Sequence, residues 1–166
     1  MNKRLISWSD MEGYCNEIIR QMVADNFKPE LIIGITRGGA LPAVMLSQYL
    51  DVKMVGLDVS LRDSDEFYGP ESNCWAMEDA SNGKRILIVD DINDTGATIN
   101  WILKDWSCRD WNIQSSENVR FAVVIDNESS KAEVTPHYSG ETINKAVDDS
   151  WIVFPYENWW LNGKLV

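Results

Sequence analysis

The chain has 166 residues, with 15 Lys and Arg against 26 Asp and Glu, so its formal charge is −11. This length suffices for one hydrophobic core and leaves no room for a second full domain. The acidic balance argues against a nucleic-acid partner, because binding along the phosphate backbone requires clustered Lys and Arg side chains. We therefore expect a single acidic domain over residues 1–166.

The beginning of the chain and its cysteines bear on the compartment. The first residues, MNKRLISWSDMEGY, include two basic side chains but no apolar run behind them, unlike a signal peptide. Apolar runs elsewhere are far shorter than the roughly 20 residues that span a bilayer. Cys15, Cys74 and Cys108 are widely spaced, and the one His does not complete a zinc site with them. We expect a cytoplasmic protein with reduced cysteines and no membrane contact.

Apolar spacing predicts helices that alternate with strands along the chain. Apolar residues recur at helical spacing over 10–26, where Ser7 or Ser9 offers an N-cap. Continuous apolar runs such as LIIGI at 31–35 are typical of strands buried on both faces. The expected elements are, in order, a helix over 10–26, a strand over 31–35, a helix over 40–50, strands over 53–59 and 85–89, a helix over 97–106 and strands over 119–125 and 151–154. This alternation predicts an α/β fold, a parallel sheet with helices on both faces.

Two stretches fall outside this alternation. Residues 60–83 are charged, contain Gly and Pro and lack a period, and so long a structureless stretch in a compact domain is often a functional lid. A two-stranded flap and a plain disordered insertion are the alternatives. Residues 126–166 hold a polar loop, a short strand and an aromatic tail, which we expect to form a small hood beside a core over about 1–125.

The strongest signal for chemistry is ILIVDDINDTGAT, residues 86–98. A buried strand there delivers Asp90 and Asp91 to the carboxyl edge of the sheet, where open α/β sheets place their ligands. The small and hydroxylated residues of 94–98 lead into a helix, and exposed backbone N–H groups with the helix dipole form a phosphate cradle. Carboxylates beside a phosphate site indicate sugar hydroxyls or a metal. The combination predicts a ribose phosphate site with Mg²⁺ nearby.

Other interpretations of this stretch fit less well. D-D-x-x-D also describes the metal motif of prenyl-diphosphate enzymes, which belongs on a helix of a larger all-helical protein. An EF-hand beginning at Asp91 would place Ile102 where the bidentate Glu belongs, and neither a P-loop nor a Rossmann glycine pattern occurs. A purely structural alternative is an acidic loop that caps the following helix through Asp94 or Thr95.

Three stretches together resemble the type I phosphoribosyltransferase family, most closely its small xanthine-guanine and hypoxanthine members. ILIVDDINDTGAT resembles the family's binding motif for phosphoribosyl diphosphate (PRPP), and IIGITRGGALPA at 32–43 resembles its pyrophosphate loop. WIVFPYE at 151–157 resembles the W-x-x-x-P-[WY]-[DE] segment of the 6-oxopurine enzymes. The resemblance covers about residues 5–158. It implies the type I phosphoribosyltransferase fold, transfer of phosphoribose from PRPP to a purine base, Mg²⁺ as cofactor and a homodimer or homotetramer.

The resemblance also implies roles for individual residues. Asp90 and Asp91 would hold the ribose hydroxyls directly or through Mg²⁺, and Asp94, beside PRPP, would take the proton that the purine loses. The family's pyrophosphate loop can carry a non-proline cis peptide, which here would join Thr36 to Arg37. The other implied sites are Arg37 and Gly38 for pyrophosphate, Thr95, Gly96, Ala97 and Thr98 for the 5-phosphate, Trp151 and Ile152 for the base, Glu157 for a second Mg²⁺, and a lid at 60–80.

One position departs from the family pattern. The purine enzymes usually place a lysine at the end of the strand expected over 119–125, where it holds the 6-oxo group of the base. Here Asp126 or Asn127 occupies that position, and Lys131 follows later. Because polar groups in a pocket decide which base it accepts, the acceptor stays open. The alternatives are the same PRPP site with another acceptor, and a non-catalytic PRPP-sensing regulator, which the negative charge disfavours.

Overall fold

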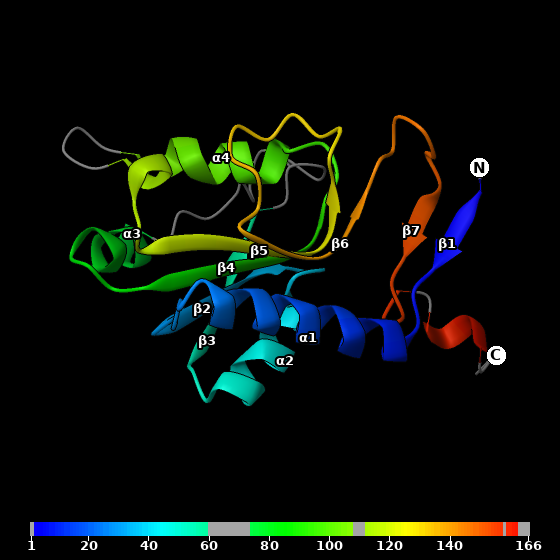
Figure 1. Ribbon diagram of the computed structural model, residues 1–166, viewed down its shortest axis with the longest axis horizontal. Helices are drawn as coiled ribbons and strands as arrows, with labels where there is room; N and C mark the ends of the chain where they lie inside the picture. The colour runs from blue at the N-terminus through cyan, green and yellow to red at the C-terminus, as the bar shows by residue number, and fades with distance from the viewer. Residues whose placement is uncertain (1, 60–73, 108–111, 158, 163–166) are drawn as a thin grey trace.

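The computed structural model describes residues 2–59, 74–107, 112–157 and 159–162. Its main sheet has five parallel strands in the order β3-β2-β4-β5-β6. They are β2 (Leu31–Thr36), β3 (Met54–Asp58), β4 (Ile86–Asn93), β5 (Val119–Asn127) and β6 (Tyr138–Ile143). The helices are α1 (Trp8–Ala24), α2 (Ala40–Leu50), α3 (Cys74–Ser81) and α4 (Ala97–Asp105), with short 3-10 turns η1 (Ile113–Ser115) and η2 (Trp159–Asn162). Helices α1 and α2 lie on one side of the sheet and α4 on the other (Figure 1), which confirms the predicted parallel α/β architecture.

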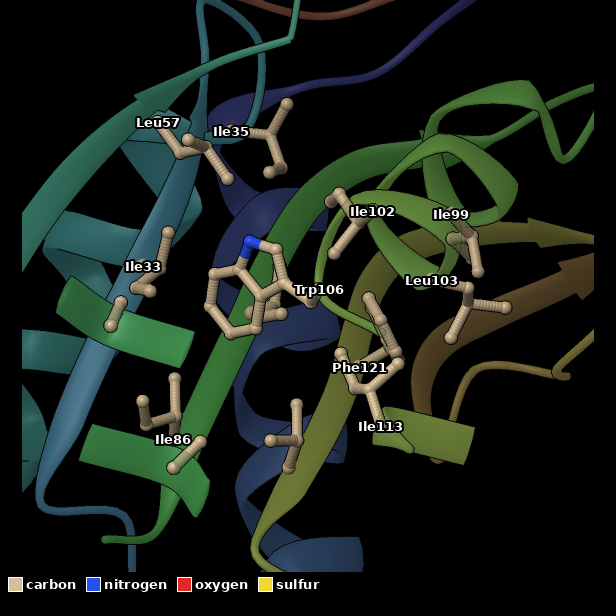
Figure 2. Close-up of a cluster of buried hydrophobic side chains, with 14 of the residues drawn as sticks. Ile33, Ile35, Leu57, Ile86, Ile99, Ile102, Leu103, Trp106, Ile113 and Phe121 are labelled. Carbon is tan, nitrogen blue, oxygen red and sulfur yellow. The ribbon is translucent and has the colours of Figure 1, made fainter. Parts of the chain in front are cut away.

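Apolar strands covered on both faces hold these layers together. Successive residues of β4 face opposite layers, since Ile88 packs in the cluster of α3 and α4 whereas Leu87 packs in the cluster of α1 and α2. Trp106, directly after α4, is fully buried, and Figure 2 shows its ring among side chains such as Ile33 and Ile102. Full burial of a large apolar side chain contributes about 1.5–3 kcal/mol. The buried residues of the inner strands are apolar up to the carboxyl ends, where Asn93 of β4 and Asp126 and Asn127 of β5 are buried polar residues.

Helix α1 begins at a capping box. The Ser7 hydroxyl accepts a hydrogen bond from the Asp10 backbone N–H at 3.1 Å, and the Asp10 carboxylate accepts one from the Ser7 N–H at 2.8 Å. This reciprocal pair satisfies N–H groups that the first turn of a helix leaves without partners. Of the two caps expected from the sequence, Ser7 is confirmed.

The boundary between core and hood differs from the expected one at residue 125. Strand β5 continues to Asn127, and β6 adds a fifth strand to the main sheet within the region assigned to the hood. In β6 only Tyr138 is buried, so this edge strand lacks the apolar run that marks the inner strands. The hood instead contains β1 (Lys3–Leu5) paired in parallel with β7 (Trp151–Val153), so it joins both ends of the chain.

Part of the stretch expected to be structureless is a helix. Residues 74–81 form α3, whose Ala76 and Ala80 are fully buried in the cluster with α4. Ala76 and Ala80 lie one turn apart on the same side of the helix. Two small residues are too few to produce a recognisable helical period in the sequence. The expectation of a structureless stretch over 60–83 is therefore wrong for 74–81, and residues 60–73 lie outside the described residues. None of the described helices is long and apolar enough to cross a membrane.

The contact between α1 and β6 can be tested at two glycines. A Cβ atom at Gly140 would lie 2.4 Å from Tyr14 Cβ and 2.7 Å from the Val124 carbonyl oxygen. We expect Gly140→Ala to lower the free energy of unfolding by about 1–3 kcal/mol, because α1 must move away from the sheet. Gly13→Ala in α1 is the matched control, since its Cβ would meet nothing within 4 Å, and it should raise stability by up to about 1 kcal/mol. Urea denaturation measures both, and equal effects would contradict this packing.

Candidate active site

A cavity of about 800 Å³ opens at the carboxyl edge of the main sheet. Its walls come from the loops after β2 and β4, and from β7 with the turn that follows it, so the main sheet and the hood both contribute. All the candidate site residues found in the sequence line it, namely Arg37, Gly38, Asp90, Asp91, Asp94, Thr95, Gly96, Ala97, Thr98, Trp151, Ile152 and Glu157. The fold thus gathers three distant stretches of chain around one space.

The loop after β2 lies directly against the carboxyl end of β4. A Cβ atom at Gly38 would stand 1.8 Å from Asp91 Oδ2, and one at Gly39 would stand 2.4 Å from a carbonyl oxygen of β4. No larger residue fits at either position, so the two glycines permit this approach. The peptide bond between Thr36 and Arg37 is cis, as expected. The exposed Arg37 residue lines the same cavity as the β4 carboxylates.

Asp90 and Asp91 place two carboxylates side by side near the end of β4. Asp90 Oδ1 accepts a hydrogen bond from the Asp91 backbone N–H at 2.9 Å. Burial, with the adjacent Asp91 charge, raises the pKa of Asp90 well above its ordinary value. Burial also raises the pKa of Asp91, although a hydrogen bond from the Tyr156 hydroxyl partly opposes this. Such crowded carboxylates favour a bound cation or hydroxyl donors, either of which stabilises the charged forms.

This donor set fits Mg²⁺. Mg²⁺ is usually bound through one or two carboxylates, and substrate phosphates and waters supply its other ligands. Within the described residues no group of three or more His, Cys, Asp or Glu could hold a metal, so Asp90 and Asp91 would act as such a partial set. Glu157 caps the turn after β7, because its carboxylate accepts a hydrogen bond from the Phe154 backbone N–H at 3.0 Å. Its charge nevertheless acts on Asp91.

The loop between β4 and α4 is shaped for an anion. Gly96 has a φ of 87°, and a Cβ there would lie 2.2 Å from the Ala132 backbone nitrogen, so both conformation and space require glycine. Helix α4 begins next, without a side-chain hydrogen bond from its N-cap. Thr95 Oγ1 accepts from the Ala97 N–H at 3.3 Å. The N–H groups and dipole of this N-terminus, which lines the cavity, suit a phosphate group.

Lys145 is a cavity residue that the sequence analysis missed. It lies in the loop between β6 and β7, its Nζ is 2.9 Å from Asp94 Oδ1, and it stands 6.0 Å from the centre of the Trp151 ring. The Asp94 carboxylate is thus paired with Lys145, and of the two residues considered as caps of α4 only Thr95 binds a backbone N–H of that helix. Asp126 and Lys131, the considered substitutes for the family's lysine, do not line the cavity. A lysine six residues before the W-x-x-x-P segment was the available signal.

Tyr156 connects the hood to both other parts of the site. Its hydroxyl lies 3.0 Å from the Gly38 carbonyl oxygen and 3.0 Å from Asp91 Oδ2. Burial and the Asp91 charge raise the pKa of Tyr156 far above its ordinary value, so the hydroxyl keeps its proton and can donate it to either oxygen. The ring stacks on Phe154 with centroids 5.5 Å apart. Tyr156 thereby fixes the glycine loop relative to the carboxylates.

Comparison with known proteins shows the family. The phosphoribosyl transferase domain model matches residues 2–158, so the chain belongs to this family. Xanthine phosphoribosyltransferase 1 of Saccharomyces cerevisiae is 27% identical, and the match covers 94% of this chain and 90% of the relative. Xanthine-guanine phosphoribosyltransferase of Idiomarina loihiensis is 26% identical over 92% of this chain and 85% of the relative.

A solved structure shows the same fold. The crystal structure of a purine phosphoribosyltransferase from Pyrococcus horikoshii superposes with a TM-score of 0.66 at 24% identity, covering 95% of this chain and 96% of that one. The expected type I phosphoribosyltransferase fold is therefore confirmed over nearly the whole chain.

The contacts of Tyr156 predict a measurable effect on PRPP binding. Tyr156→Phe keeps the stacked ring and removes the hydroxyl that joins Gly38 to Asp91. We expect the KM for PRPP to rise about fivefold, because a hydrogen bond contributes about 1 kcal/mol net. The matched control is Tyr49→Phe, at an exposed tyrosine of α2 outside the cavity, which should leave the KM unchanged. Steady-state kinetics decides, and identical KM values in the two variants would refute the role of the hydroxyl.

Proposed function

We propose that the protein transfers phosphoribose from PRPP to a 6-oxopurine and releases pyrophosphate and a nucleoside monophosphate. The observation that carries this proposal is the Lys145–Asp94 pair beside Trp151, in the same cavity as the phosphate loop and the β4 carboxylates. A cation, a proton acceptor and an aromatic face are the groups that recognition of such a base requires. The names of the relatives, which include xanthine and guanine, support the same class of acceptor.

PRPP would occupy the part of the cavity nearest the sheet. Its 5-phosphate would bind the loop of residues 95–98, and its pyrophosphate would lie at Arg37 and Gly38. Its ribose hydroxyls would face Asp90 and Asp91, which accept hydrogen bonds. When bound by these two carboxylates, with Glu157 available to a second ion, Mg²⁺ would offset the negative charge that builds up on the leaving pyrophosphate.

The base would lie between the hood and Lys145. Trp151 is 38% exposed and offers its ring for stacking, while the backbone at Ile152 is the proposed contact for the exocyclic group. The Lys145 ammonium is a donor without acceptor capacity. It therefore pairs with a 6-oxo oxygen, whereas the 6-amino group of adenine would present another donor. This chemistry selects hypoxanthine, guanine or xanthine over adenine.

The reaction exchanges one bond at the anomeric carbon for another. The bond from C1 to the pyrophosphate oxygen breaks as a nitrogen of the purine forms its bond to C1. The purine loses a proton, which the Asp94 carboxylate accepts as general base, and the electron pair of the broken bond leaves with pyrophosphate. Arg37 stabilises the charge on this leaving group.

The same observations bear on the alternatives. A PRPP site for another acceptor would have no need of an ammonium directed to the general base, so Lys145 favours the 6-oxopurine. A non-catalytic regulator would not need a general base, so the presence of Asp94 in the cavity favours an enzyme. We further propose that the enzyme is cytoplasmic and forms a homodimer or homotetramer, for which exposed apolar residues such as Trp8 and Trp159 offer contact surface.

A panel of bases tests the function. The protein is incubated with Mg²⁺, PRPP and hypoxanthine, guanine, xanthine or adenine, and pyrophosphate release and nucleotide formation are followed together. We expect turnover with at least one 6-oxopurine and little with adenine. Absence of turnover with every purine would refute the proposal, and nucleotide formation from a pyrimidine alone would establish the alternative acceptor.

Two substitutions separate the roles of the pair. Asp94→Asn should lower kcat by about 10²–10⁴, the usual contribution of general base catalysis, with a much smaller change in the KM for PRPP. Lys145→Met should raise the KM for hypoxanthine about 10-fold to 100-fold, through loss of a charged hydrogen bond. Lys131→Met, at an exposed lysine outside the cavity, is the matched control. Equal losses in all three variants would contradict these assignments.

A further inference from the structure

Asn127, the last residue of β5, is one of the two residues at the position where the family pattern expects a lysine. It does not line the cavity, and it is only 5% exposed. A buried amide has to satisfy its donors and acceptor within the protein. The partners of Asn127 are therefore informative about why an amide occupies this position.

The two ends of the amide bind the two members of the base-binding pair. Asn127 Nδ2 donates to the Asp94 carbonyl oxygen at 2.7 Å, and Asn127 Oδ1 accepts from the Lys145 backbone N–H at 3.0 Å. Ser129 completes the acceptor side, because its N–H and hydroxyl also donate to Oδ1, at 3.2 Å and 2.8 Å. One side chain thus ties the loop after β4 to the loop after β6.

These contacts close a ring. Asn127 holds the backbones of Asp94 and Lys145, and their side chains meet each other at 2.9 Å. Each functional side chain is therefore fixed at its backbone by the amide and at its tip by its partner. Strand pairing does not itself position Lys145, since the backbone bond at the ends of β5 and β6 joins the Glu128 N–H to the carbonyl of Ile143, two residues before Lys145.

We propose that Asn127 is a positioning residue that sets Lys145 and Asp94 in register for the acceptor base. This proposal rests on the proposed function of the site. A lysine at the end of β5 would carry its own ammonium to the base; in this chain the amide instead anchors a lysine supplied by another loop. On this proposal, the amide at the end of β5 and the lysine in the loop after β6 together replace the single lysine of the family pattern.

A double-mutant cycle tests the proposal through the KM for hypoxanthine, which does not depend on the fraction of folded enzyme. We expect Asn127→Ala to raise this KM about tenfold. In the Lys145→Met background the same change should have less than about a twofold further effect, because interacting residues are not additive. The KM for PRPP should stay within about twofold. Independent, multiplying effects would overturn the proposal, since a merely structural role acts alike in both backgrounds.

Asn100→Ala is the matched control. The Asn100 amide also bridges two segments, donating to the Lys131 carbonyl at 2.9 Å and accepting from the Glu133 N–H at 2.7 Å, but it lies outside the cavity. Its loss should destabilise the fold without changing the KM for hypoxanthine. A rise equal to that of Asn127→Ala would assign the effect to general loosening and overturn the proposal.

Chemical labelling tests the anchor independently of activity. Lysine acetylation is followed by mass spectrometry at Lys145, whose side chain is 16% exposed, with the 38% exposed Lys84 as internal reference. Asn127→Ala should raise relative labelling of Lys145 several-fold, and Asn127→Asp, which keeps the acceptor for the Lys145 N–H, should leave it near the wild-type level. Unchanged labelling in Asn127→Ala, or equal increases in both variants, would overturn the proposal. Absence of turnover in the wild type would instead refute the proposed function. The labelling experiment would still show whether Asn127 holds Lys145 in place.

Discussion

The burial of both faces of the central strands is the constraint on which the site depends. Most residues of strands β2, β4 and β5 pack in the apolar clusters on one face or the other, so the buried polar side chains of these strands, Asn93, Asp126 and Asn127, come only at their carboxyl ends. On β4 the first carboxylates, Asp90 and Asp91, come where this cover ends. Because the strands are parallel, their carboxyl ends meet at one edge, and loops of different sequence converge there. The packing of the core thus determines where chemistry can occur.

At this edge the backbone approaches more closely than side chains would allow. Gly38 lies against the Asp91 carboxylate, and Gly96 lies against the backbone of Ala132. The result is a cavity whose walls combine carboxylates with backbone N–H groups and one arginine. The net charge of −11 first argued only against nucleic acid. A polyanionic substrate remains compatible with it, because in the proposed site the acids would face hydroxyls and a cation while N–H groups and Arg37 would bind the phosphates.

The features that could be predicted from the sequence are those determined by residues close together in the chain. The apolar runs, the Ser7 cap and the motif at 86–98 each depend on neighbouring residues, so their structure could be expected. Strand β6 and the parallel pairing of β1 with β7 could not, because edge strands carry weak patterns and pairing partners lie far apart in the chain. Helix α3 was not predicted for a similar reason, since the residues that it buries fully in the cluster are two alanines, with the partly buried Met77 beside them.

The role of Lys145 could not be predicted from the sequence either, because its partner Asp94 lies far away in the chain. A motif places a functional group at a fixed offset from its neighbours, so the family pattern points to Asp126, Asn127 and Lys131, at or after the end of β5. The fold instead brings an ammonium to Asp94 from a loop that begins after β6, a strand that the sequence did not predict. Only the closed contacts of Asn127 with both partners explain why an amide stands at the end of β5. In the proposed site, recognition of the base would therefore depend on the loop after β4, the end of β5 and the loop after β6, which are distant in the chain and adjacent in the fold.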